Sequence, residues 1–398
     1  MKLSKNDRIL CEVIQASVFD KTPIFTSDIN WSDVYVELTG QTLAALPGDL
    51  LLTMEGLEDS LRISWKRVIA IQVGYRQYYL YIQNMFLEQL RSHRIPVVVI
   101  KGTAASRYYP KPEYRTMGDV DFLVHPSRVK EAEAVLKSLG CETEYRNHSH
   151  YNHIRLLYDG VEIELHWSFD ISTHKEQISE MDQCILEGLE FPEWFQDEEY
   201  RIPMLPKLQN GLVLLQHIRQ HLREGIGLRQ IVDWMLYVNE NLDDGFWRLA
   251  FQKKAVSFGL EQLAMTLTRM CQLYLGLPTD HISWCIRADE VLCNQLLKYI
   301  LESGNMGNKH KEETNHVRTF IGYKGGILEA IKQLQLDGEN TWPVLKRHHW
   351  LRPFAWLYRI ARSALRLIQY HVSLRQLYLY HKEGKQQAAM LRKLGVIK

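Results

Sequence analysis

Two carboxylates stand two residues apart at Asp119 and Asp121, within the sequence Gly-Asp-Val-Asp-Phe-Leu-Val of residues 118–124. Residues two apart on a β-strand point to the same side. The spacing therefore predicts that both carboxylates project together while Val120 and Phe122 face the core. Two adjacent carboxylates repel each other unless a cation lies between them. The pair predicts a site for a divalent cation, and its hard oxygen ligands favour Mg²⁺ or Mn²⁺.

A second group of polar residues lies on a later predicted strand. Residues 161–167 read Val-Glu-Ile-Glu-Leu-His-Trp, and this alternation places Glu162, Glu164 and His166 on one face. An Asp-Gly pair joins this run to the β-prone residues 153–158, which is a strong signal of a hairpin. The hairpin offers a third carboxylate to the predicted site. We expect His166 to be a hydrogen-bonded neighbour of that site, because Mg²⁺ prefers oxygen ligands.

A buried strand at 96–100 and a tight turn at Lys101, Gly102 and Thr103 precede the Asp-x-Asp strand. The backbone N–H groups of such a turn can hold phosphate oxygens. The following loop carries Arg115, which suits bidentate contact with phosphate, whereas Lys101 suits contact as a point charge. A turn, an Asp-x-Asp strand and a later acidic strand in this order suit nucleotidyl transfer, in which two metal ions neutralise a triphosphate.

This order of motifs resembles the polymerase-β-like nucleotidyltransferase superfamily, and more narrowly its family of uncharacterised nucleotidyltransferases. The resemblance is carried by Lys101-Gly102, by Arg-x-x-Gly-Asp-h-Asp-h-h-Val at residues 115–124 and by h-Glu-h-His-Trp at residues 163–167, where h is an apolar residue. It covers residues 96–170 firmly. It implies an α+β fold, in which a polymerase-β-like domain with a mixed sheet is flanked by helical regions at both ends.

The resemblance also implies roles for single residues. Asp119, Asp121 and Glu164 would be the catalytic ligands of Mg²⁺ or Mn²⁺, and Gly102 and Thr103, where the superfamily commonly has Gly-Ser, would hold the phosphates. The implied reaction moves a nucleoside monophosphate from a nucleoside triphosphate to an acceptor hydroxyl. The Gly-Thr departure keeps open an alternative of another class, a catalytically inactive module that binds a nucleotide or a partner.

The chain has 398 residues, of which 46% are hydrophobic and 24% charged, as in globular proteins with a sizeable core. Helical spacing predicts an N-terminal helical region over 1–95 and a C-terminal helical domain over 206–398, with the nucleotidyltransferase-like domain over 96–205 between them. The six cysteines are scattered without a C-x-x-C pair, and no apolar secretory segment follows the basic start. Both features predict a cytoplasmic protein with buried free thiols.

Two predicted helices beyond residue 206 carry polar pairs at i, i+4. His217 and His221 have zinc-like spacing but lack the Glu of His-Glu-x-x-His, so we expect them to line the cleft or pack between helices. Arg229 and Asp233 predict an intrahelical ion pair, with contact between Arg229 and the nucleotide or acceptor as the alternative. Three further histidines, at 148, 150 and 153, are expected in a solvated loop entering a strand rather than as ligands of a transition metal.

The formal net charge of +1 conceals a strong asymmetry. Residues 343–398 carry twelve Lys or Arg and one acid, Glu383, so this basic tail has a net charge of +11 and the remainder has −10. Its arginines alternate with apolar residues over 350–367, which predicts an amphipathic cationic helix. Docking on the acidic remainder and peripheral contact with an anionic membrane both fit this pattern. The lack of a basic face elsewhere argues against long nucleic acid and leaves a small molecule or a protein as acceptor.

Overall fold

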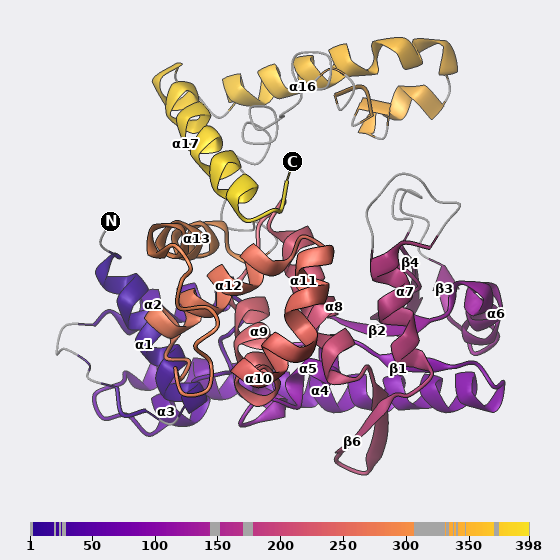
Figure 1. Ribbon diagram of the computed structural model, residues 1–398. Coiled ribbons are helices and arrows are strands. Elements are labelled where there is room, and N and C mark those ends of the chain that lie inside the picture. Colours follow the sequence, from indigo (N-terminus) through magenta and orange to yellow (C-terminus); the bar gives the residue numbers. More distant parts are fainter. Residues whose placement is uncertain are drawn as a thin grey trace. The chain divides into compact units, whose positions relative to one another are not determined.

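The computed structural model (Figure 1) describes residues 3–19, 21–23, 25, 29–143, 152–169, 178–305 and 331–397, the last range without 332–333, 337, 340, 347 and 370–373. The chain divides into two compact units. One comprises residues 1–306 with 394–396, and the other comprises 307–393 with 397–398. The domain boundaries predicted near residues 95 and 205 lie inside the first unit and stay predictions.

In the described residues, seven strands form one mixed sheet in the spatial order β3-β4-β5-β2-β1-β7-β6. β2 runs parallel to β5 and antiparallel to β1, whereas β1 runs parallel to β7. This mixed sheet among many helices confirms the predicted α+β fold class. The strands are β1 (Val97–Val99), β2 (Asp119–Val124), β3 (Glu142–Thr143), β4 (His153–Tyr158), β5 (Val161–His166), β6 (Glu193–Asp197) and β7 (Tyr200–Met204).

The predicted hairpin is formed by β4 and β5. Tyr158 pairs with Val161, and the two residues between them have positive φ, 46° at Asp159 and 79° at Gly160. Two central residues with φ above zero define the turn whose twist matches that of antiparallel strands, and Asp-Gly is among the pairs that tolerate it best. The turn fixes the register of β5 and therefore the face on which Glu164 and His166 lie.

One face of the sheet packs on the long helix α4 (Asp59–Ser92) and on α6 (Val129–Ser138), and α4 runs along β1 and β2 in Figure 1. Their buried core includes Phe86 of α4 and Leu136 of α6 together with Val120 and Phe122 of β2. Because side chains alternate along a strand, Asp119 and Asp121 lie on the opposite face. The predicted orientation of β2 is confirmed.

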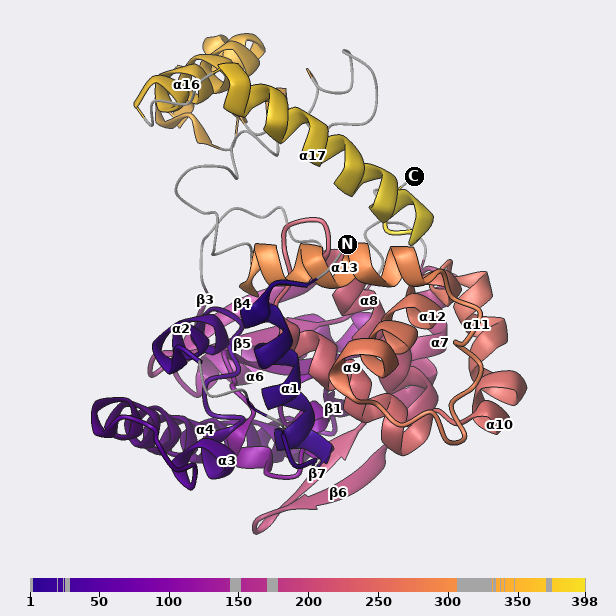
Figure 2. The ribbon, with the colours of Figure 1, turned by 90° about the vertical axis from the view of Figure 1, so that its left-hand side faces the viewer.

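The other helices of the first unit pack mainly on one another beside the sheet (Figure 2). The N-terminal helix packs against residues far along the chain, since Gln15 Nε2 donates to the carbonyl of Tyr274 at 2.9 Å. These helices are α1 (Lys5–Phe19), α2 (Trp31–Gly40), α3 (Gly48–Leu52), α5 (Gly102–Ser106), η1 (Pro112–Tyr114), η2 (Pro126–Arg128), α7 (Glu180–Leu186), η3 (Glu187–Leu189), α8 (Lys207–His221), α9 (Leu228–Asn241), α10 (Asp244–Phe246), η4 (Trp247–Phe251), α11 (Gln252–Ser257), α12 (Glu261–Met270), η5 (Cys271–Leu275) and α13 (Glu290–Ser303).

The second unit holds the basic tail. Its described helices are η7 (Pro343–Lys346), η8 (His349–Phe354), α16 (Ala355–Gln369) and α17 (Leu374–Lys393). Apolar side chains of α16 are exposed, with Leu357 at 45% and Leu365 at 67%. The predicted helix is therefore present over residues 355–369, and at least these two of its apolar side chains are exposed. None of the described helices is both long enough and apolar enough to cross a membrane.

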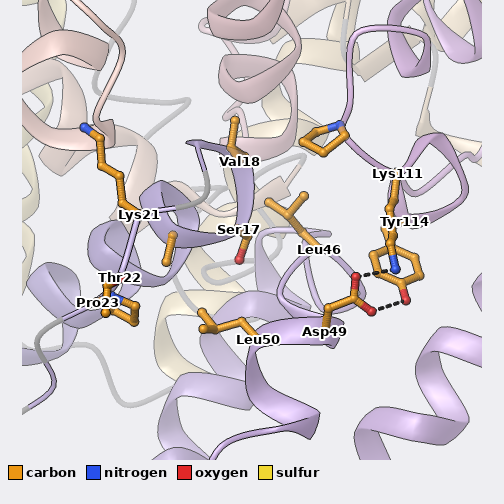
Figure 3. A pocket seen from close by; sticks show the side chains of 12 residues that line it. Ser17, Val18, Lys21, Thr22, Pro23, Leu46, Asp49, Leu50, Lys111 and Tyr114 are labelled. Atoms are coloured by element: carbon orange, nitrogen blue, oxygen red, sulfur yellow. Dashed lines mark hydrogen bonds and ion pairs between the residues drawn. The ribbon is translucent and has the colours of Figure 1, made fainter.

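A pocket of about 620 Å³ opens among α1, α3 and η1 (Figure 3). Lys111 forms an ion pair with Asp49 at its rim, and the hydroxyl of Tyr114 donates to the same carboxylate at 2.9 Å. These charges neutralise each other. The pocket shares no lining residue with the carboxylates predicted as metal ligands.

Candidate functional site

The parallel pairing of β2 with β5 brings three carboxylates together. Asp119 stands opposite Glu162 in this ladder, and Asp121 stands opposite Glu164. One carboxylate oxygen each from Asp119, Asp121 and Glu164 lies within 4.8 Å of the others. The three residues predicted as metal ligands therefore converge, whereas Glu162 is not in the group and instead pairs with Arg155 at 3.2 Å.

The three carboxylates differ in their exposure to solvent. Asp121 is 1% exposed and Glu164 is 6% exposed, while Asp119 is only half-buried. Asp119 thus lies on the open side of the cluster, where a ligand would enter, and the other two form its floor.

Two nitrogen donors already contact the buried carboxylates. Lys101 Nζ lies 2.7 Å from Asp121 Oδ1 and 3.8 Å from Glu164 Oε2. His166 Nε2 lies 2.8 Å and 3.0 Å from the same two oxygens. His166 is therefore the hydrogen-bonded neighbour that was expected. Lys101, which was expected to contact phosphate, instead directs its ammonium into the carboxylate cluster.

The backbone of Lys101 explains this direction. The residue follows β1 and precedes α5, and it has a φ of 52° and a ψ of −126°. The amide of the preceding Ile100 donates to the carbonyl of Asp121 at 3.1 Å, which ties the end of β1 to β2. Positive φ is costly for a residue with a side chain, and such strain concentrates at functional sites. The strained backbone turns the side chain of Lys101 toward β2 rather than along the chain.

The surroundings of the three carboxylates separate their pKa values. Burial and the negative charge of Asp121 raise the pKa of Asp119 to about 7. Burial also pushes the pKa of Asp121 upward, but Lys101 and the hydrogen bond from His166 outweigh it and lower that pKa. Burial acts on Glu164 in the same direction, and the hydrogen bond from His166 and the charge of Lys101 again lower its pKa. The negative charge of Asp119 is thus the least compensated of the three.

The second oxygen of Glu164 faces β4. Its Oε1 lies 3.3 Å from His153 Nε2 and 3.1 Å from Arg155 Nε, so both oxygens of this carboxylate are engaged. His153, Glu164 and His166 form a second group of possible metal ligands that shares Glu164 with the first. Burial lowers the pKa of His153 to about 4, so its ring is neutral at neutral pH. His148 and His150, which were considered together with His153, lie outside the described residues.

The predicted turn at Gly102 and Thr103 is the first turn of the short helix α5. Thr103 is fully buried, and its hydroxyl donates to Gln83 Oε1 of α4 at 2.7 Å. The hydroxyl is therefore committed to packing between α5 and α4. The phosphate contact predicted for Gly102 and Thr103 would therefore be made by backbone N–H groups at the start of α5.

Arg115 is also committed elsewhere. It is 3% exposed, and its Nε and Nη2 donate to the two oxygens of Asp233 at 2.7 Å and 2.8 Å. The hydroxyl of Tyr109 donates to Asp233 Oδ1 at 2.8 Å. Contact between Arg115 and a phosphate would require breaking this pair. In this structure Arg115 links the loop before β2 to Asp233, and its contact with phosphate stays a prediction.

The intrahelical pair expected between Arg229 and Asp233 is wrong, because Asp233 uses its oxygens for Arg115 and Tyr109. Arg229 Nη1 donates to the carbonyl of Thr116 at 2.8 Å, and its buried Nε has no hydrogen-bond partner among the described residues. Its charge acts on the pKa of Asp119. The guanidinium of Arg229 thus interacts electrostatically with Asp119, and contact between Arg229 and the nucleotide or acceptor stays a prediction.

His217 and His221 lie one turn apart on α8, with ring centroids 4.3 Å apart. Burial lowers the pKa of both rings, to about 4 for His221, and the charges of Lys101 and Arg229 lower them further. Both rings are half-buried. Both histidines are therefore neutral at neutral pH. Charges of the carboxylate cluster act on their pKa values, but neither histidine belongs to the group of possible metal ligands.

A divalent cation fits the residues present. Asp121 Oδ2 is buried and has no hydrogen-bond partner among the described residues. A buried carboxylate oxygen without a partner is costly, and the raised pKa of Asp119 indicates that positive charge is lacking beside it. Hard carboxylate oxygens are the ligands of Mg²⁺ and Mn²⁺. Asp119 and Asp121 Oδ2 could hold such an ion.

A known family and a solved structure are similar to this chain. A family model described as uncharacterised nucleotidyltransferase matches residues 27–276. Among solved structures, the chain is similar to an antigenic nucleotidyltransferase-like protein from Paracoccidioides brasiliensis, with 13% sequence identity and a TM-score of 0.31, over 52% of this chain and 96% of that one. No curated protein matches the sequence. Because the family model spans more than half of the chain and includes every carboxylate of the cluster, the protein belongs to the family of uncharacterised nucleotidyltransferases.

Proposed function

We propose that the protein is a metal-dependent nucleotidyltransferase that moves a nucleoside monophosphate from a nucleoside triphosphate to an acceptor hydroxyl. The observation that carries the proposal is the convergence of Asp119, Asp121 and Glu164 on two adjacent parallel strands. Family membership supports the reaction class. The acceptor is proposed to be a small molecule or a protein in the cytoplasm.

Asp119 and Asp121 would hold the metal, with Asp121 presenting its unpartnered Oδ2. A divalent ion bound there supplies positive charge to the triphosphate and acidifies an acceptor hydroxyl. Glu164 completes the group of carboxylates. Both of its oxygens contact neighbouring side chains. The negative charge of Glu164 would therefore hold His166 and Lys101 in position.

The remaining residues would position the triphosphate. Gly102 and Thr103 would contact its β- and γ-phosphates through backbone N–H groups, because the Thr103 hydroxyl is taken by Gln83. In the reaction the acceptor oxygen bonds to the α-phosphorus, the bond from that phosphorus to the bridging oxygen breaks so that pyrophosphate leaves, and the proton of the acceptor hydroxyl passes to water. Arg229, whose charge lowers the pKa of Asp119 and whose buried Nε has no hydrogen-bond partner among the described residues, would contact the phosphates.

The proposal is tested by binding of a triphosphate that cannot react. Calorimetry with α,β-methylene-ATP should show binding that requires Mg²⁺ or Mn²⁺ in the native protein. Asp121→Asn should lose at least tenfold in Mn²⁺-dependent affinity, because the substitution removes the charge of a metal ligand at nearly constant shape. Glu162→Gln is the matched control, since it removes a charge from the neighbouring strand β5 outside the cluster and should leave the affinity unchanged. Equal affinities in the native protein and Asp121→Asn would contradict the proposal.

One observation favours a second candidate function, a nucleotide- or partner-binding module without catalysis. Lys101 and His166 already contact the buried carboxylates of Asp121 and Glu164, which gives these carboxylates partners without a metal. The module would bind α,β-methylene-ATP equally well with EDTA and with Mg²⁺, and the natural triphosphates would release no pyrophosphate. The calorimetry above separates the two functions.

A further inference from the structure

The oxygens of the buried carboxylates are not equally available to a metal. Lys101 Nζ and His166 Nε2 lie 2.7 Å and 2.8 Å from Asp121 Oδ1. The same two nitrogen atoms also lie near Glu164 Oε2, Nζ at 3.8 Å and Nε2 at 3.0 Å. The space between Asp121 and Glu164 is therefore already filled by nitrogen donors.

Lys101 is built into this position rather than reaching it from solvent. Its side chain is 12% exposed, and its backbone is held in a strained conformation with φ at 52° between the end of β1 and the start of α5. Keeping such a conformation at a residue other than glycine requires support from the surrounding structure. That support includes the hydrogen bond from the amide of Ile100 to the carbonyl of Asp121.

The carboxylate oxygens that remain available to a metal ion lie on the other side of Asp121. Its Oδ2 has no hydrogen-bond partner among the described residues, and the carboxylate of the half-buried Asp119 has neither a hydrogen bond nor an ion pair within that same part of the chain. The cluster is thus divided into an inner side occupied by an ammonium and an outer side with two available carboxylates.

We propose that Lys101 Nζ is a resident cation of the site, so that the carboxylates take up one divalent ion, on the side of Asp119 and Asp121 Oδ2, rather than two. This inference rests on the proposed function and specifies how its metal site is filled. Nζ of Lys101 and Nε2 of His166 already face Asp121 Oδ1 and Glu164 Oε2, so Asp119 and Asp121 Oδ2 are the carboxylate groups left for an ion. A second divalent ion between Asp121 and Glu164 would be placed beside the ammonium and would be repelled by it.

The number of bound ions tests the proposal directly. Mn²⁺ binding is counted by electron paramagnetic resonance, first with Mn²⁺ alone and then with saturating α,β-methylene-ATP. The native protein should bind one ion per chain in both cases. Lys101→Met keeps the apolar stem but removes the charge, so it should bind a second ion in the presence of the nucleotide analogue, and its affinity for the first should rise at least tenfold.

Two further variants keep the test decisive if Lys101→Met folds poorly. Lys101→Arg retains the positive charge and should keep one ion per chain, while Lys111→Met removes a lysine from outside the cluster and should behave as the native protein does. A merely structural role for Lys101 would change stability in Lys101→Met without changing the number of ions. A native protein that binds two ions would overturn the resident cation and leave the proposed function standing. A native protein that binds none would overturn both.

Discussion

Arg115 and Asp233, which are 118 positions apart in the sequence, form a buried ion pair with two parallel hydrogen bonds of 2.7 Å and 2.8 Å. The pair joins the loop before β2 to helix α9. Gln72 of α4 adds a hydrogen bond to the carbonyl of Arg115 at 2.9 Å. This network fixes the loop that leads directly into Asp119 and therefore positions the open side of the carboxylate cluster.

Breaking this pair should destabilise the fold strongly. Arg115→Ala or Asp233→Asn should each lower the free energy of unfolding by about 3–5 kcal/mol, because the partner is left as an uncompensated buried charge. Urea unfolding of both single variants and the double variant measures this. The double variant should lose less than the sum of the single losses. Losses below about 1 kcal/mol in both single variants would show that the pair is not the structural link described here.

The hydroxyl of Thr103 should matter for stability and not for nucleotide binding. Thr103→Val leaves Gln83 Oε1 buried without its donor, at a cost of about 1–3 kcal/mol in the free energy of unfolding. Thr103→Ser retains the hydroxyl and is the control. Affinity for α,β-methylene-ATP with Mg²⁺ should be equal in all three proteins. A tenfold loss of affinity in Thr103→Val without a loss of stability would place the hydroxyl on the phosphates instead.

The histidine pair of α8 should make the protein less stable in acid. Burial holds the pKa of His221 at about 4 in the folded protein, below the usual 6.5. The unfolded chain then binds more protons between these values, so stability falls as the pH drops below 6.5. At pH 5 this single group should cost up to about 2 kcal/mol relative to pH 7. Urea unfolding at both pH values should show a smaller difference for His221→Gln than for the native protein. Equal differences would contradict the effect.

The thiols of the native protein should be unreactive. All six cysteines are free and buried, as expected from their scatter in the sequence, and burial raises the pKa of Cys11, Cys285 and Cys293 to about 12. Because the thiolate is the reactive form, Ellman's reagent at pH 8 should modify fewer than one thiol per folded chain. All six should react in guanidinium chloride. Rapid modification without denaturant would show that the first unit opens readily.

The strands of the site could be predicted from sequence because their signals are local. The bounds of β4 were predicted to the residue, and β5 ends one residue earlier than predicted. Alternating side chains and the Asp159-Gly160 turn fixed which carboxylates share a face. The convergence of Asp119, Asp121 and Glu164 followed from that pattern and from the family resemblance, before any contact was known.

The contacts that divide the site could not be predicted, because they depend on tertiary structure. The ammonium of Lys101 meets Asp121 only because the backbone at Lys101 adopts positive φ, which no local pattern indicates for a lysine. Asp233 pairs with Arg115, which is distant in the sequence, and not with Arg229, its neighbour one turn away on α9. The spacing within α9 therefore gave the wrong pair.

The hairpin of β6 and β7 was also missed, for a reason of turn chemistry. Its turn contains Glu198 at a φ of 52°, where a glycine or asparagine would have been the usual signal. β7 then pairs in parallel with β1, where Val99 stands opposite Met204. The two strands beyond β1 could not be assigned to the sheet from sequence, because their place depends on this long-range pairing.

The central claim is that Asp119 and Asp121 hold a divalent ion that accompanies a nucleoside triphosphate. The most direct test is a crystal structure of the native protein with Mn²⁺ and α,β-methylene-ATP, in which the anomalous signal locates the metal. We predict a Mn²⁺ peak at about 2.1 Å from an oxygen of Asp119 and from Asp121 Oδ2, with Lys101 Nζ still in contact with Asp121 Oδ1. A bound nucleotide without any Mn²⁺ peak between these two aspartates would contradict the account.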